Sequence, residues 1–179
     1  MSNAIGVIEL NSIARGIEVS DFMLKASQVD LVRSSTICPG KYVVIIGGDT
    51  GNVRASLAEG DKHGAECVLD TLIIPNVHPQ LIPAISLSNR VEVRGAVGVM
   101  EFFSVTSAIK AADFAAKAAN VNLIEVRIGY AIGGKGFVTL TGDVGSVREA
   151  VTAATKEAQM LVNTAVIPMP DPRLFDSLL

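Results

Sequence analysis

Hydrophobic and polar positions alternate near the start of the chain, and the period then changes. The alternation from Ile5 to Leu10 predicts a β-strand, because successive side chains of a strand point to opposite faces. Ser12 follows as a natural N-cap, and a helix is expected from there to about Ala26. Two runs rich in β-branched residues come next, at 29–37 and 41–46, and the Pro-Gly pair between them predicts a hairpin.

A second helix and a last strand complete this pattern. The stretch Gly48-Asp49-Thr50-Gly51 predicts a turn into a helix, with Asp49 as its N-cap and its end near Ala65. A strand at 68–74 stops at Pro75. The order β-α-β-β-α-β is the ferredoxin-like arrangement of the α/β (α+β) class, here with a short C-terminal helix added.

The whole pattern occurs twice. A shift of about 92 residues pairs Ala4-Ile5-Gly6-Val7-Ile8-Glu9 with Ala96-Val97-Gly98-Val99-Met100-Glu101. The match continues through Ser12 with Ser104, Asp21 with Asp113, Lys25 with Lys117, Gly40-Lys41 with Gly134-Lys135, Gly48-Asp49 with Gly142-Asp143 and Ile74-Pro75 with Ile167-Pro168. We therefore expect two tandem, unpermuted domains at 1–90 and 91–179.

Composition indicates that the chain assembles with itself. Hydrophobic residues make up 49% and charged residues 18%, and the mean hydropathy is +0.44, so the chain is more apolar than an ordinary soluble domain. No uninterrupted apolar run approaches the roughly 20 residues of a membrane span. The net charge of −3 gives no footprint for nucleic acid, and the start lacks the basic region of a secretory signal. A cytosolic homo-oligomer is expected.

The motifs of common active sites are missing or incomplete. The stretch 47–51 lies where a phosphate loop would lie but satisfies neither glycine-rich fingerprint, and 142–145 repeats it as an ordinary turn. His63 and His78 have no metal-ligating neighbours at the usual spacing. No Ser-His-Asp or paired-carboxylate arrangement can be assembled, so we predict that the protein is not an enzyme.

Cys38 is the candidate site residue. It lies in the predicted hairpin turn Thr36-Ile37-Cys38-Pro39-Gly40-Lys41, whereas the equivalent turn of the second copy, around Ile132-Gly133-Gly134, has no cysteine. An incidental exposed thiol is one interpretation, and Cys67 is expected to pack in the core. The other is that a cyclic trimer brings three copies of Cys38 around its axis, where thiolates can hold an iron–sulfur cluster.

The two copies resemble a known family. The strings Ala96-Val97-Gly98-Val99-Met100-Glu101, Gly133-Gly134-Lys135 and Gly142-Asp143-Val144-Gly145 closely resemble the bacterial microcompartment (BMC) shell domain, and the resemblance covers nearly the whole chain. Among tandem-domain members, the stretch through Ser12-Ile13-Ala14-Arg15-Gly16 and the Cys38 turn looks most like the T-type subunit of propanediol-utilisation shells.

This resemblance implies a homotrimer that forms a pseudo-hexagonal tile with a central pore in a polyhedral shell. Other BMC shell proteins would be its partners, with encapsulated enzymes or a redox protein as further ones, all in the bacterial cytoplasm. Cys38 would supply one thiolate per subunit to a 4Fe-4S cluster for electron transport or cluster delivery. The pore lining is expected to be Ile37, Cys38, Pro39, Gly40, Ile132, Gly133 and Gly134.

Lys25 and Lys117 match the lysine that lies along tile edges in this family, and each can also pair with an aspartate four residues earlier. The edge arginine of the family is missing after both final strands, at Pro75-Asn76-Val77-His78 and Pro168-Met169-Pro170-Asp171. Two other functions stay open. One is the same tile with an empty, metabolite-conducting pore, and the other is an oligomeric ligand-sensing module.

Overall fold

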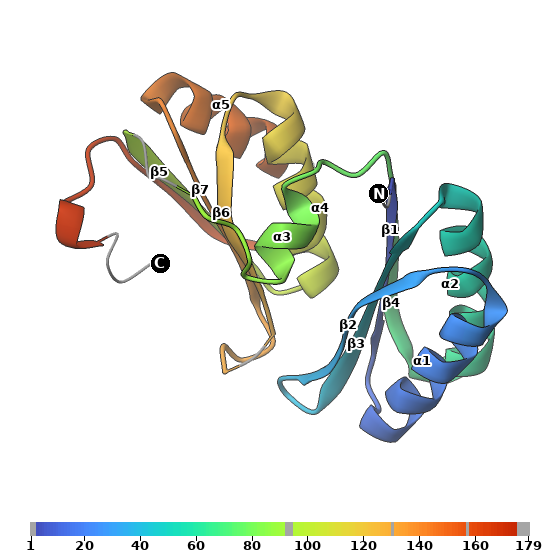
Figure 1. The fold of residues 1–179 in the computed structure, drawn as a ribbon. Coiled ribbons are helices and arrows are strands. Elements are labelled where there is room, and N and C mark those ends of the chain that lie inside the picture. Colours follow the sequence, from blue (N-terminus) through green and yellow to red (C-terminus); the bar gives the residue numbers. More distant parts are fainter. Residues whose placement is uncertain (1–2, 92–94, 130, 157, 175–179) are drawn as a thin grey trace. The chain divides into compact units, whose positions relative to one another are not determined.

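The computed structural model describes residues 3–91, 95–129, 131–156 and 158–174, which form two compact units (Figure 1). Unit 1 comprises residues 1–77 and 129–134, and unit 2 comprises residues 78–128 and 135–179. The division falls before 90 because the segment after the first copy packs within unit 2. We describe each unit separately.

Unit 1 contains the predicted order of elements. They are β1 (Ala4–Leu10), α1 (Ile13–Ala26), β2 (Asp30–Ile37), β3 (Lys41–Gly48), α2 (Thr50–Gly64), the 3-10 turn η1 (Ala65–Cys67) and β4 (Val68–Pro75). The strands form one antiparallel sheet in the order β2-β3-β1-β4. Both helices lie on one face of this sheet (Figure 1).

The core of unit 1 lies between the sheet and its two helices. Apolar side chains of β1 and β3 meet those of α1 and α2 there, and the buried set is Ala4, Ile8, Leu10, Val19, Met23, Tyr42, Val44, Ile46, Val53 and Leu57. Gly16 lets α1 approach β3 closely, because a Cβ at this position would lie 2.4 Å from the Tyr42 ring. Burial of this apolar surface is the main force that holds the helices on the sheet.

Unit 2 repeats the arrangement. It contains α3 (Leu81–Ile85), β5 (Ala96–Phe102), α4 (Val105–Ala118), β6 (Asn122–Ile128), β7 (Gly136–Gly142), α5 (Val144–Thr155) and β8 (Leu161–Ile167). Its sheet has the order β6-β7-β5-β8. The helix α3, which follows the first copy in sequence, packs beside β6 and α4 (Figure 1). The predicted fold class, two tandem β-α-β-β-α-β domains, is confirmed.

Some local predictions differ from the structure at the helix ends. Ser12 and Ser104 cap their helices as predicted, and Asp143 accepts from the backbone N–H of Ser146. Asp49 holds the N-cap position without a side-chain capping bond. In the second copy the Ala-rich stretch predicts a helix end near Ala158, and the helix α5 ends about one turn earlier, at Thr155.

The predicted C-terminal helix follows β4 as α3, and only residues 172–174 of its counterpart after β8 lie among the described residues, where they form a helical turn. Within the described ranges, no helix is long and apolar enough to span a membrane.

Candidate functional site

The turn at Cys38 joins the two ladder-paired strands β2 and β3. Ile37 pairs with Lys41, which places Cys38, Pro39 and Gly40 at the tip of the hairpin. Gly40 has a φ of +81°, a left-handed conformation that favours glycine, and this closes the turn. Ile37 is buried, the Cys38 thiol is partly exposed, and Pro39 and Gly40 are exposed. The predicted position of Cys38 in an accessible turn is therefore where the structure places it.

Gly129 and residues 131–134, from the second copy, belong to unit 1 and lie beside this turn. The backbone N–H of Cys38 donates to the carbonyl oxygen of Gly129 at 2.8 Å. Gly134 is buried, and a Cβ there would lie 2.4 Å from the Cys38 carbonyl oxygen. Only glycine tolerates that approach together with a φ of +79°. The structure thus brings the two predicted pore turns together, while their role in a pore stays a prediction.

Metal-binding groups are sparse within one chain. Among the described residues, no cluster of three or more His, Cys, Asp or Glu side chains could hold a metal ion. Both cysteines are free thiols, and Cys67 packs against the hydrophobic core of unit 1. Cys38 is thus one soft, partly exposed donor, and an iron–sulfur cluster needs several thiolates. The donor set fits such a cluster only if other copies of the chain contribute their Cys38.

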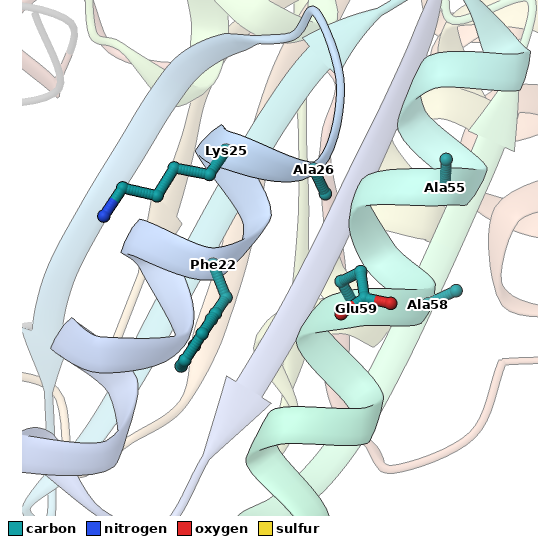
Figure 2. A pocket seen from close by; sticks show the side chains of 6 residues that line it. All are labelled: Phe22, Lys25, Ala26, Ala55, Ala58 and Glu59. Carbon is teal, nitrogen blue, oxygen red and sulfur yellow. The ribbon is translucent and has the colours of Figure 1, made fainter.

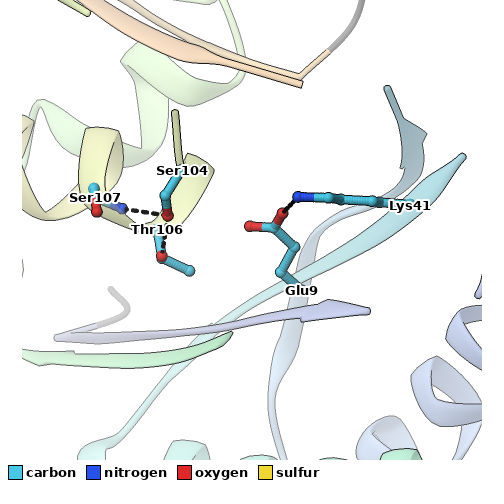
Figure 3. A network of polar contacts seen from close by, with 5 residues as sticks. All are labelled: Glu9, Lys41, Ser104, Thr106 and Ser107. Atoms are coloured by element: carbon cyan, nitrogen blue, oxygen red, sulfur yellow. Dashed lines mark hydrogen bonds and ion pairs between the residues drawn. The ribbon is translucent and has the colours of Figure 1, made fainter. Parts of the chain in front are cut away.

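An ion pair beside the hairpin was not predicted from the sequence. The Nζ of Lys41 donates to Oε1 of Glu9 at 2.7 Å, and the carboxylate of Glu9 is buried (Figure 3). Its second oxygen, Oε2, has no partner among the described residues. In unit 2, Lys135 makes the same 2.7 Å contact with Glu101, which is one-third exposed. Glu9 and Lys41 recur in the repeat as Glu101 and Lys135, and this recurrence is the feature of the sequence that could have predicted the ion pair.

The two predicted edge lysines make the expected ion pairs. Lys25 contacts Asp21, and Lys117 contacts Asp113, each four residues earlier on the helix. Lys25 also lines a shallow depression of about 580 Å³ between α1 and α2, together with Phe22, Ala26, Ala55, Ala58 and Glu59 (Figure 2). That Lys25 and Lys117 contact neighbouring tiles stays a prediction.

The histidines lie in ordinary structural surroundings. The ring of His63 stacks on Phe22 with centroids 3.7 Å apart, and its Nε2 lies 3.2 Å from Glu59. Partial burial lowers the pKa of His78 from its ordinary value, and the nearby Asp113 opposes this shift. His63 lies on the helix α2, and His78 precedes α3.

A family model describes almost the whole chain. The model of the BMC domain matches twice, at residues 4–77 and 96–170, and these ranges correspond to the two sheets with their helices. The chain belongs to the BMC-domain family.

Comparison with individual members narrows the relationship. The chain is 46% identical to the bacterial microcompartment shell protein PduT of Citrobacter freundii, over 95% of this chain and 94% of that protein. It is 51% identical to a microcompartment protein from Desulfitobacterium hafniense, whose crystal structure matches 97% of this chain with a TM-score of 0.92. The fused permuted hexameric shell protein MSM0275 shares the fold, with a TM-score of 0.61 and 23% identity.

These matches confirm the resemblance that the repeated strings indicated. This BMC-domain protein is a structural shell protein of the PduT type and not an enzyme. Its place is the microcompartment shell in the bacterial cytoplasm.

Proposed function

We propose that this BMC-domain protein forms a homotrimeric, pseudo-hexagonal tile whose central pore carries a 4Fe-4S cluster held by three Cys38 thiolates. A threefold ring of two-domain chains contains each residue of one copy three times. Cys38 occurs in the first copy only, so such a ring contains three of these thiols around its axis.

The observation that carries the proposal is the place of Cys38. It lies at the tip of a hairpin, partly exposed, with its backbone N–H held by Gly129 of the second-copy turn. Cys67 is also partly exposed, but it packs against the hydrophobic core of unit 1 and does not lie at the tip of a hairpin. Cys38 is therefore the thiol better placed to meet copies of itself in an assembly.

The chain's own residues would hold and enclose the group. Cys38 is the ligand, Pro39 and Gly40 line the opening beside it, and Gly133 of the second turn is exposed there as well. A 4Fe-4S cluster supplies one-electron transfer when it is bound, and its potential depends on burial and on hydrogen bonds to its sulfur atoms. Electron transport across the shell, or delivery of the cluster, follows as the role of the tile.

Tile edges and partners complete the proposal. Lys25 is largely exposed and Lys117 partly exposed, which suits contacts with neighbouring tiles. The partners are other BMC shell proteins, with encapsulated enzymes or a redox protein on the two sides of the pore. The missing edge arginine weakens these contacts relative to tiles that carry it.

Anaerobic purification tests the cluster. We expect brown protein with iron, a visible absorption band and an electron paramagnetic resonance signal after reduction. Cys38→Ser should abolish all three, whereas the control Cys67→Ser should leave them unchanged. Colourless, iron-free protein that the Cys38 substitution does not alter would refute the cluster.

The same preparation separates the other two functions. A trimer that lacks iron and binds a small molecule in its pore would support the empty, metabolite-conducting tile. A discrete oligomer that forms no sheets, tubes or shells under the electron microscope is the ligand-sensing module.

A further inference from the structure

The segment that follows β4 covers one side of unit 2. Leu81, Ala84 and Ile85 of α3 are buried, and α3 packs on β6 and α4 (Figure 1). Polar contacts fix this segment in register along β6 and against α4. They are His78 N–H to Asp113 Oδ1 at 2.8 Å, Gln80 Nε2 to Asn122 Oδ1 at 3.1 Å, Leu123 N–H to Gln80 Oε1 at 2.8 Å, and Asn89 Nδ2 to the Leu123 carbonyl oxygen at 2.9 Å.

Residues 171–174, which follow β8, have the same local structure as residues 78–81. His78-Pro79-Gln80-Leu81 corresponds to Asp171-Pro172-Arg173-Leu174, with the spacing that separates Pro75 from Pro168. The N–H of Leu81 donates to the His78 carbonyl at 2.9 Å, and the N–H of Leu174 donates to the Asp171 carbonyl at 2.9 Å. Both segments therefore begin a helical turn in the same way.

The apolar spacing also continues in the sequence. Ile82 and Ile85 correspond to Phe175 and Leu178, which lie outside the described residues.

The surface of unit 1 that corresponds to the covered side of unit 2 is exposed. We call it the α1/β2 face, and it consists of Ile17, Asp21, Asp30 and Leu31. Leu31 is 47% exposed, while its counterpart Leu123 is fully buried, and Ile17 is 57% exposed, while its counterpart Ile109 is fully buried. The Asp21 side chain is 57% exposed, whereas that of Asp113 is 5% exposed.

The charges at corresponding positions of the segments and the surfaces differ between the two copies. In unit 2, Gln80 meets Asn122, which is a neutral amide pair. At the corresponding positions the C-terminal segment carries Arg173 and the α1/β2 face carries Asp30, which are of opposite charge. The guanidinium of Arg173 now contacts Asp171 of its own chain and is exposed. A charged pair between arginine and carboxylate is a strong and specific contact.

We propose that the α1/β2 face binds the C-terminal segment, residues 168–179, of a second copy of this chain. Arg173 donates to the carboxylate of Asp30, the N–H of Asp171 donates to Asp21, and Leu174 takes the place that Leu81 has in unit 2. The segment that follows β4 packs on unit 2, which is the next unit along the chain. In a ring, the next unit after unit 2 is unit 1 of another chain, so the segment that follows β8 packs there. The inference rests on the proposed trimer and names the contact that closes it.

Cross-linking tests the contact directly. In a Cys38→Ser, Cys67→Ser background, Asp30→Cys and Arg173→Cys are treated with a short bis-maleimide and run on a denaturing gel. We expect products of two and three linked chains. The matched control, Gln80→Cys with Asn122→Cys in the same background, should link within one chain and run as a monomer.

The native mass, measured by light scattering, separates the two proposals. A trimer of about 56 kDa, from chains of 18.7 kDa, that gives no interchain product while the control reacts overturns this contact and leaves the tile intact. A monomer overturns the proposed trimer itself. A product linked within one chain shows that the segment binds its own unit 1 and overturns the second copy as the partner.

Charge reversal gives an independent measurement. Arg173→Glu and Asp30→Arg should each raise the Kd of the trimer by roughly tenfold or more, because like charges then face each other. The double substitution should restore most of the affinity. Arg148→Glu, at an exposed position of α5, is the control and should change it little. Equal behaviour of Arg173→Glu and this control would overturn the pairing with Asp30.

Discussion

Replacing Lys41 with methionine is expected to destabilise unit 1 far more than the same change at Lys135 destabilises unit 2. The Glu9 side chain is 3% exposed, so Lys41→Met leaves a buried carboxylate without its cation. Breaking a buried ion pair in this way costs about 3 kcal/mol or more. The Glu101 side chain is 34% exposed, and losing a pair that water already screens costs about 0–1 kcal/mol.

Urea unfolding followed by far-UV circular dichroism measures the difference at one fixed protein concentration. With a slope of about 2–3 kcal/mol/M, Lys41→Met should lower the midpoint of unit 1 by about 1 M, and Lys135→Met should lower that of unit 2 by a third of this or less. Adding Glu9→Gln to Lys41→Met should recover part of the loss, because the unpaired charge is removed. Equal small shifts for both lysine variants would refute the reasoning from burial.

The remaining predictions concern two glycines, Asp143 and His78. Gly16→Ala should lower stability by about 1–3 kcal/mol through the clash with Tyr42, whereas Gly51→Ala, with open space around it, should be neutral or stabilising, as urea midpoints will show. Asp143→Ala should lower the midpoint of unit 2, and because hydrogen bonds from Ser146 lower the pKa of Asp143, this difference should vanish as the pH falls through the acid range where the carboxylate protonates. Burial lowers the pKa of His78, so its neutral form stabilises the fold above the ordinary histidine pKa, and this contribution is lost as the pH falls; an NMR titration should place its pKa below the ordinary value.

Element order could be predicted from the sequence because each boundary has a local chemical signal. Ser12 and Ser104 mark helix starts, Pro75 ends a strand, and the Pro-Gly pair at 39–40 marks the hairpin that carries Cys38. These signals act within a few residues, so the chain needs no tertiary contact to display them. The family resemblance followed from the same short strings.

The differences between equivalent positions could not be predicted, because they depend on what packs against each copy. Leu31 and Leu123 are the same residue at the same place in the repeat, yet one is half exposed and the other buried. Glu9 and Glu101 differ in the same way. The close approach of Gly134 to Cys38 joins residues about a hundred positions apart, and nothing local indicates it.

The docking of α3 has a thermodynamic consequence for assembly. The contact of Gln80 with Asn122 forms within one chain, so it costs no translational entropy and does not depend on concentration. In the proposed ring, the three segments that contain Gln80 are docked within their own chains before the subunits meet. The three C-terminal segments that contain Arg173 must dock on another molecule, so these three contacts bear the whole entropic cost of association. A neutral amide pair suffices for the contact within a chain, while the charged pair lies at the contact between chains. Dilution should therefore open the ring only at the three contacts between chains.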